Sequence, residues 1–222
     1  MKKIDTKKFN KIYQNHLKWL AGESGGSRAE LYGYDLTLTD FYRKKFSGAI
    51  MYRCDFTKVD ASYVNFSGAN LSESNFFKAK LKYANLTNAE LFGANFVETD
   101  LLSVKTDQGT RNFYIACPEE GSFIAYKKAQ EKIVVLEILE DARRSSATSL
   151  DCRCDKAKVL RIENLDGSIA EETSVVSDYD PTFVYTIDGI VSVNDFEEDR
   201  WKECSKGIHF FLSKECARRY AR

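Results

Sequence analysis

Residues 29–103 read as fifteen consecutive units of five: AELYG YDLTL TDFYR KKFSG AIMYR CDFTK VDASY VNFSG ANLSE SNFFK AKLKY ANLTN AELFG ANFVE TDLLS. The third residue is large and apolar in fourteen units, with Ala61 as the exception. The first residue is small in thirteen units, and the second is Asp or Asn in ten. A period of five matches neither the helical 3.6 nor the strand 2.0, so the chain must turn a corner in every unit.

This pattern predicts a stack of coils. One large and one small side chain of each unit point inward, so stacked coils bury ladders of Phe and Leu with Ala between them. The Asp and Asn side chains are suited to hydrogen bonds with nearby backbone at the corners. Since no coil can bury its apolar face alone, the units are stable only as a stack.

The units resemble the pentapeptide-repeat family, whose pattern is A-(D/N)-L-x-x. ANLSE, ANLTN and ANFVE match that pattern closely, whereas KKFSG, AIMYR and VDASY depart from it. The resemblance implies a mainly β fold, a right-handed quadrilateral β-helix with four units in each coil. Fifteen units would make about four coils, stacked at roughly the 4.8 Å spacing of neighbouring strands.

Both ends of such a stack need a cover, because a bare coil end exposes apolar surface and unpaired backbone. The apolar spacing over residues 5–20 predicts a helix that ends before Gly22, and HLKWLAGESGGSRAEL resembles the lead-in of many pentapeptide-repeat chains. We therefore expect a capping helix and linker over 1–28, the β-helix over 29–103, and a second domain over 104–222.

The period of five disappears after residue 103, and the composition of the last part predicts a β-rich α+β domain. Asp166-Gly167 and Asp188-Gly189 read as turns, and a helix is expected at 214–221. Strand-like runs lie at 113–116, 122–126, 132–138, 158–162, 182–187 and 207–212.

Charge and hydropathy exclude several classes of protein. Lys and Arg together number 33, as do Asp and Glu, which makes direct nucleic-acid binding by bulk charge unlikely. No run approaches the roughly 18 apolar residues of a membrane-spanning helix, and no apolar segment follows the basic N-terminus as in a secretory signal. We expect a cytoplasmic protein, and a homodimer, because exposed coil ends favour pairing.

Four residues of the last domain are candidate zinc ligands: Cys152, Cys154, Cys204 and His209. They are the nitrogen and sulfur donors that zinc prefers, although the pair Cys152-Arg-Cys154 has one intervening residue where strong zinc motifs have two. The alternative is that these thiols are small buried apolar groups.

A second candidate site is an anion-binding loop. Its residues offer forked cations and hydroxyls suited to phosphate, but no glycine-rich cradle accompanies them. They are Arg143, Arg144, Ser145, Ser146 and Thr148.

A third candidate rests on a resemblance. Residues 207–211, GIHFF, followed by the expected helix, are similar to the strand and helix of ADP-ribosyltransferases. The resemblance implies an NAD-binding strand ending at Tyr126 and a central aromatic at Tyr185, with His209 in the matching strand; no catalytic glutamate can be placed. Separately, RSSATSLDCRCDKAKVL and DRWKECSKGIHFFLSKECARRY resemble an uncharacterised domain often fused behind pentapeptide repeats, one without an established activity.

The leading functional hypothesis is a non-enzymatic interaction or scaffold protein, since specific enzyme motifs such as G-x-S-x-G, H-E-x-x-H or a P-loop are absent. It would take a protein partner. The alternative is a nucleotide- or NAD-binding C-terminal module with a small nucleotide ligand, for which a phage-encoded, anti-defence role is left open. A gyrase-binding mimic of DNA is less favoured, because residues 29–103 carry eight Lys or Arg against nine acids.

Overall fold

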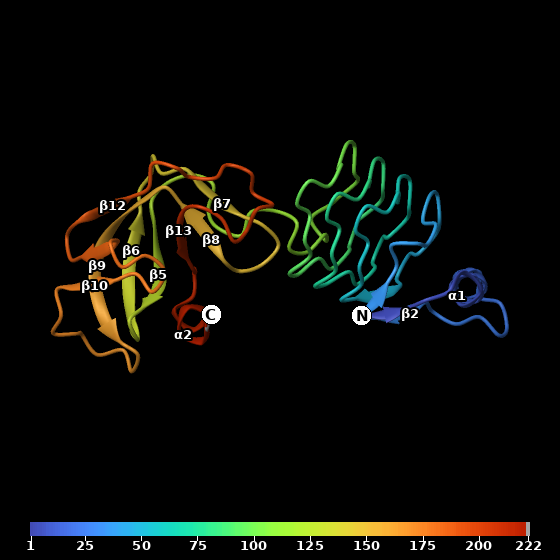
Figure 1. The fold of residues 1–222 in the computed structure, drawn as a ribbon, viewed down its shortest axis with the longest axis horizontal. Coiled ribbons are helices and arrows are strands. Elements are labelled where there is room, and N and C mark those ends of the chain that lie inside the picture. The colour runs from blue at the N-terminus through green and yellow to red at the C-terminus, as the bar shows by residue number, and fades with distance from the viewer. Residues whose placement is uncertain (221–222) are drawn as a thin grey trace. The chain divides into compact units, whose positions relative to one another are not determined.

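The computed structural model describes residues 1–220, which form a mainly β chain with two helices. The chain divides into two compact units, Met1–Tyr114 and Ile115–Arg222 (Figure 1). Each unit is built around its own core.

The first unit is held by parallel backbone pairing between residues twenty positions apart. Strand β2 (Glu30–Tyr32) pairs with β4 (Ile50–Tyr52), and the short β1 (Lys2–Lys3) pairs with β3 (Tyr34–Asp35). Isolated bridges continue the twenty-residue spacing from Asp35↔Asp55 to Asn85↔Lys105. Twenty residues are four units of five, so equivalent units of successive coils lie directly against one another.

The interior of these coils confirms the inward assignment of the third residue. Every third-position side chain from Leu31 to Phe96 is buried, Ala61 included. The ring of Phe76 stacks between those of Phe56 and Phe96, at centroid distances of 4.6 Å and 5.2 Å. Buried alanines at first positions fill the space between the ladders.

The corners follow one local design. The carbonyl of a third residue accepts a hydrogen bond from the amide three positions on, as from Ala69 to Phe66 at 2.9 Å, and the fifth residue has a positive φ, as at Tyr63 and Lys78. This is the geometry of a type II turn. The second-position side chain accepts from the amide two residues on, as Asn65 Oδ1 does from Ser67 at 3.0 Å. Both devices are local, which explains why the unit repeats so regularly.

Backbone pairing runs past the last apolar unit. Leu91 donates to the carbonyl of Arg111 at 3.2 Å, and Glu90 bridges to Arg111, twenty-one positions on. The extra residue is taken up by a turn in which Asp107 accepts from the hydroxyl of Thr110 at 2.9 Å. The ladder therefore reaches residue 111, because backbone pairing does not require the apolar period.

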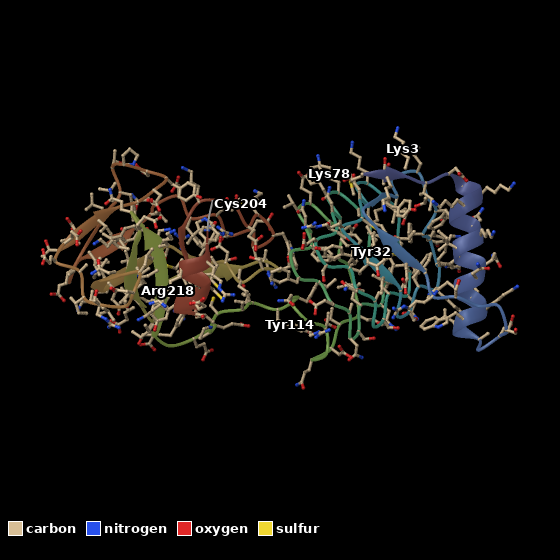
Figure 2. All side chains as sticks on the ribbon, turned by 90° about the horizontal axis from the view of Figure 1, so that it is seen from below. Lys3, Tyr32, Lys78, Tyr114, Cys204 and Arg218 are labelled. Carbon is tan, nitrogen blue, oxygen red and sulfur yellow. The ribbon has the colours of Figure 1, made fainter. Side chains whose placement is uncertain are left out.

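Helix α1 (Thr6–Leu20) lies against one end of the coils (Figures 1 and 2). Asp5 caps its N-terminus by accepting from the Lys8 amide at 2.8 Å. Phe9, which is buried, brings its ring within 5.2 Å of the Phe41 ring. The buried His16 accepts through Nδ1 from the amide of Ala29 at 3.1 Å, so the helix is joined to the start of the first coil.

The second unit contains a four-stranded and a three-stranded antiparallel sheet, in the orders β12-β9-β6-β5 and β13-β8-β7. An antiparallel bridge between Tyr126 and Phe211 connects them, and β10 pairs with β11 as a separate ribbon. The strands are β5 (Phe123–Ala129), β6 (Lys132–Ile138), β7 (Arg144–Ser146), β8 (Cys152–Cys154), β9 (Lys156–Asn164), β10 (Ser174–Val176), β11 (Val184–Thr186), β12 (Ile190–Ser192) and β13 (Ile208–Phe210).

Several elements of the second unit differ from the sequence expectation. Residues 113–116 form no strand, and the short strands β7, β8, β10 and β12 were not expected. The last helix, α2 (Lys214–Arg219), lies within the expected range, whose last residue, 221, lies outside the described residues. Lys214 ties α2 to the sheet by donating to the buried Glu163 at 2.6 Å.

Candidate functional site

A cavity of about 690 Å³ lies in the second unit. Its walls come from the start of β13, from β11 and the segment before it, and from β5. Three sequence-predicted residues line it: Tyr185 and His209 of the expected NAD site, and the zinc-ligand candidate Cys204. Tyr126, predicted for the same site, does not line it; its ring packs near the ammonium group of Lys214 at 5.6 Å.

His209 is fixed in the cavity wall by two contacts. Its Nδ1 lies 2.9 Å from Oδ2 of Asp151, and its Nε2 lies 2.9 Å from the carbonyl oxygen of Ser205. Both contacts are to oxygen acceptors, so each is made when the facing nitrogen carries a hydrogen.

Aromatic side chains form the inner wall of the cavity. Tyr185 is 2% exposed, and burial raises the pKa of its phenol far above the usual range. The ring of Phe183 packs on it at a centroid distance of 5.2 Å and an interplanar angle of 64°. Tyr185 belongs to the core of the unit, and Phe183 packs against that core.

The segment from Cys204 to His209 is held from behind by Arg153. The Arg153 side chain is buried, and burial lowers the pKa of its guanidinium. Its Nη1 donates to the carbonyls of Glu197 at 3.0 Å and Lys206 at 2.8 Å. Gly207 has a φ of +149°, and a Cβ there would meet Arg153 and Phe196 at 3.2 Å. Arg153 therefore fixes one wall of the cavity without lining it.

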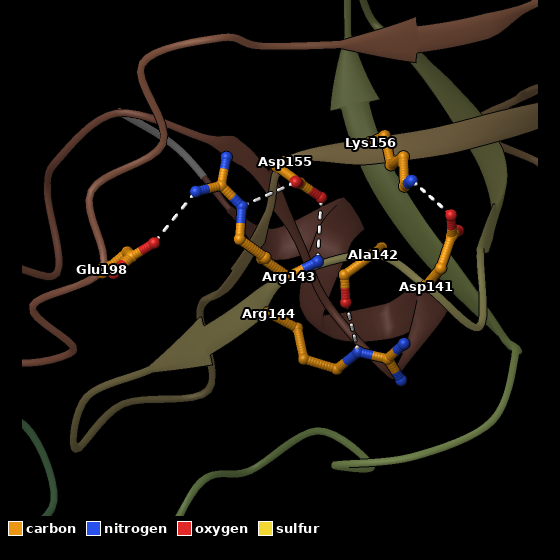
Figure 3. Close-up of polar contacts among 7 residues, drawn as sticks. All are labelled: Asp141, Ala142, Arg143, Arg144, Asp155, Lys156 and Glu198. Atoms are coloured by element: carbon orange, nitrogen blue, oxygen red, sulfur yellow. Dashed lines mark hydrogen bonds and ion pairs between the residues drawn. The ribbon is translucent and has the colours of Figure 1, made fainter.

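The second hollow, of about 410 Å³, contains Arg143 and Arg144, but neither is free for an anion. Arg143 Nε donates to Asp155 at 2.8 Å and its Nη1 to Glu198 at 2.9 Å (Figure 3). These carboxylates, Asp155 first, raise the pKa of Arg143 above its usual value. Arg144 points away from them, and its Nε donates to the carbonyl of Ala142 at 3.1 Å (Figure 3). Its Nη1 donates to the carbonyl of Gly121 at 2.7 Å.

The rest of the expected anion-binding loop is also occupied by structural contacts. The hydroxyl of Ser146 accepts from the amide of Ala116 at 2.7 Å, and Thr148 is buried. The hydroxyl of Ser145 is buried with no hydrogen-bond partner among the described residues. Arg144 and Ser146 thus bond nearby backbone and Arg143 binds carboxylates, so these contacts do not favour an anion-binding loop.

The four candidate zinc ligands do not come together as one group. Over residues 1–220 no group of three or more His, Cys, Asp or Glu side chains could hold a metal ion. Cys152 and Cys154 are buried in β8, whereas Cys204 is exposed. The Cys117 contact and burial raise the pKa of the Cys152 thiol, and burial raises that of Cys154.

Three residues that hold the region together were missed in the sequence: Asp151, Arg153 and Arg200. Arg200 is a half-buried cation whose Nε donates to the carbonyl of Ser146 at 3.0 Å, and partial burial lowers its pKa. The separation between partners is 58 residues for the Asp151–His209 contact and 54 for Arg200–Ser146. No local pattern signals such pairs.

The first unit has a different feature on its surface, a column of aromatic side chains that we call the tyrosine column: Tyr42, Tyr63 and Tyr83. Each is 44–45% exposed. The Tyr63 ring stacks on Tyr83 at 4.9 Å and meets the Tyr42 ring edge-on at 5.9 Å. The guanidinium of Arg43 lies 5.1 Å from the Tyr63 ring and 5.2 Å from the Tyr42 ring.

Charged side chains elsewhere on the coils pair between neighbouring coils. Arg53 Nε lies 2.6 Å from Glu73, and Lys82 Nζ lies 3.1 Å from Asp100. Lys and Arg side chains of the repeat thus lie beside its Asp and Glu side chains, so the surface of the coils is not uniformly acidic. No helix of the described chain is long and apolar enough to cross a membrane.

Comparison with known families divides the chain at a similar place. Residues 45–77 and 69–101 match the pentapeptide repeats (8 copies), and residues 113–217 match a family of unknown function (DUF5758). No curated protein matches the chain.

Solved structures similar to the chain are themselves described as pentapeptide-repeat proteins. One from the Arabidopsis thaliana thylakoid lumen is 29% identical over 36% of this chain and 67% of its own, with a TM-score of 0.31. One from the cyanobacterium Cyanothece 51142 is 30% identical over 37% and 59%, with a TM-score of 0.21. HetL of Nostoc sp. strain PCC 7120, described as involved in heterocyst differentiation regulation, is 23% identical over 37% and 49%, with a TM-score of 0.31. The chain thus spans about half to two thirds of these structures.

Proposed function

Because residues 45–101 carry pentapeptide repeats and residues 113–217 match a family of unknown function, we propose that the protein is a non-enzymatic interaction protein. Its repeat region would be a right-handed quadrilateral β-helix of about four coils, with α1 capping one end. This solenoid presents a surface to a protein partner.

The observation that carries this proposal is the tyrosine column. Tyrosine and arginine are enriched at the centres of protein interfaces, because they combine apolar contact area with polar groups. Here three tyrosines and Arg43 lie on successive coils, and no described residue hydrogen-bonds the hydroxyls of Tyr42, Tyr63 or Tyr83. A partner can therefore engage rings and hydroxyls together.

Rigidity supports the same conclusion. Tyr63 and Tyr83 each donate a backbone hydrogen bond to the next coil, to Lys82 at 2.8 Å and Leu102 at 2.9 Å. The rings also support one another by stacking. A surface already ordered in the free protein loses less conformational entropy on binding, which favours affinity.

The test is quantitative affinity capture from the native host with wild type and the double variant Tyr63→Asn/Tyr83→Asn. Asn suits these positions because both have φ near +60°, which Asn adopts more readily than most residues. We expect the double variant to keep its melting transition and to lose at least one protein that wild type captures.

The matched control is Tyr32→Asn, which removes an exposed tyrosine, 46% accessible, outside the column. It should capture the same proteins as wild type. Equal capture by all three proteins, or equal loss in the control and the double variant, contradicts the proposal.

A further inference from the structure

Beyond the interaction role of the repeats, we infer that the 690 Å³ cavity of the second unit is a binding site for a nucleoside monophosphate. The base would lie against its aromatic inner wall, and the sugar and phosphate at its charged mouth. Small-molecule sites typically measure roughly 300–1,000 Å³, so a ligand of this size fits.

The exposure of the lining side chains separates the inner wall from the mouth. Tyr185 and Ile208 are both 2% exposed, and the half-buried Phe183 packs on Tyr185. Tyr185 and Ile208 are covered by their neighbours, so the aromatic surface that a planar ring can reach is that of the half-buried Phe183, with Tyr185 packed behind it. An aromatic wall of this kind binds any base by stacking, since every base has a π-face.

The mouth carries charges of both signs. Tyr179 is 58% exposed, and the side chains of Lys206 and Asp195 are 73% and 64% exposed. Asp180 and Asp195 are acceptors suited to the hydroxyls of a ribose, and Lys206 is a cation suited to a phosphate. A nucleotide offers a group to each of these: a base to the apolar wall, hydroxyls to the carboxylates and a phosphate to the ammonium group.

The contact between Lys206 and Asp195 leaves the lysine available to a ligand. Their charged atoms lie 3.4 Å apart at the surface, and exposed pairs of this kind contribute little free energy. A phosphate that approaches Lys206 therefore displaces only a weak interaction.

The wall that carries Lys206 is held by contacts within the protein. Arg153 holds the Lys206 carbonyl at 2.8 Å, and His209 holds the Ser205 carbonyl at 2.9 Å. These contacts also position Cys204, the exposed cysteine of the cavity wall. Cys204 is thus a built-in reporter of occupancy, since the other cysteines are buried or half-buried.

The experiment measures the rate at which N-ethylmaleimide labels Cys204 in the full chain, read by mass spectrometry of peptides. AMP, GMP, CMP and UMP are each tested up to millimolar concentration, beside their nucleosides and inorganic phosphate. We expect at least one monophosphate to slow labelling of Cys204 while labelling of Cys216, outside the cavity lining, stays unchanged.

Two variants test which side chain contacts the phosphate and which contacts the base. Lys206→Ala should weaken binding of the monophosphate about tenfold and leave the nucleoside unaffected, because it removes one charge-assisted contact to phosphate. Phe183→Leu keeps an apolar side chain but removes the ring, so it should weaken nucleoside and monophosphate alike. The control Lys158→Ala removes a lysine of β9 outside the cavity lining and should change neither.

Three results would overturn the inference: no monophosphate protects Cys204, inorganic phosphate alone protects it as well as any nucleotide, or Lys206→Ala and Lys158→Ala act alike. Each of these is measured on folded protein, because the melting transition of every variant is recorded first. None of these three results concerns the surface of the repeats. The nucleotide-site inference can therefore fail while the interaction proposal stands.

Discussion

Phe66 lies in the middle of the repeat interior. It is fully buried, with the rings of Phe41 and Phe56 each 6.0 Å away. Phe66→Ala leaves a cavity among these rings, and we expect it to lower the free energy of unfolding by about 3–5 kcal/mol. Urea denaturation followed by circular dichroism measures the change. Phe92→Ala, at a 41% exposed ring, should cost far less; an unchanged Phe66→Ala transition would refute the inward assignment.

His16 makes the first unit sensitive to acid. Burial, with a smaller contribution from the Arg28 charge, lowers the pKa of His16 below its ordinary value. Below about pH 6.5 the unfolded chain therefore takes up a proton that the folded chain does not, so stability is lost as the pH falls through that value. Above it both states are neutral, and His16 adds no pH dependence.

We therefore expect the free energy of unfolding of wild type to fall more steeply between pH 7 and pH 5 than that of His16→Gln. Gln keeps an acceptor for the Ala29 amide but does not titrate. Denaturation curves at intermediate pH values compare the two slopes. Parallel slopes would mean that His16 does not titrate differently in the two states.

At the scale of elements, the side chain of Arg153 holds the long segment between β12 and β13 in place. Arg153 donates to carbonyls of Glu197, Asp199 and Lys206, and its guanidinium lies 5.4 Å from the Phe196 ring. One side chain thus holds three points of a segment that has no strand or helix of its own.

Arg153→Leu should leave those carbonyls without donors and raise the amide hydrogen-exchange rate across residues 194–207. Hydrogen bonds to a charged group contribute about 1.5–3 kcal/mol each, so exchange there should accelerate by at least tenfold. Exchange in β6 serves as the internal reference. Arg219→Leu, at an exposed side chain bonded only to Glu215 in its own helix, should have no such effect. Unchanged exchange in Arg153→Leu would show that the segment is held by other contacts.

Elements were predictable where their signal is local. Helix α1 and the long strands β6 and β9 carry a helical or apolar pattern of their own, and all three lie where the sequence places them. The three-residue strands β7 and β8 carry none, because they exist through pairing with each other and with β13. Residues 113–116 are apolar but find no strand to pair with, so the expected strand does not form.

At the scale of the whole molecule, the two compact units have separate cores, one of stacked Phe and Leu, the other around β6 and β9. Differential scanning calorimetry should therefore resolve two transitions. Phe66→Ala is expected to lower one melting temperature, and Ile162→Ala the other, since each deletes core volume from a single unit. One transition that both variants shift equally would mean that the units unfold together.

The sequence alone determined the repeat unit, down to which side chain of each five is buried. It could do so because the hydrogen bonds that form each corner are local. The backbone bond of the turn and the bond from the second-position side chain to the backbone join residues at most three positions apart. The sequence did not predict the positive φ of the fifth residue, because Tyr and Lys together occupy that position as often as Gly does.

Only the tertiary structure decided the second unit's sites. It buried Cys152 and Cys154, assigned Arg144 and Ser146 to structural contacts, and brought Tyr185 and His209 to one cavity. The physical reason is distance along the chain: the contacts that set these roles join residues about 20 to 60 positions apart. Such contacts depend on how strands pair across the unit, and neither composition nor spacing records that pairing.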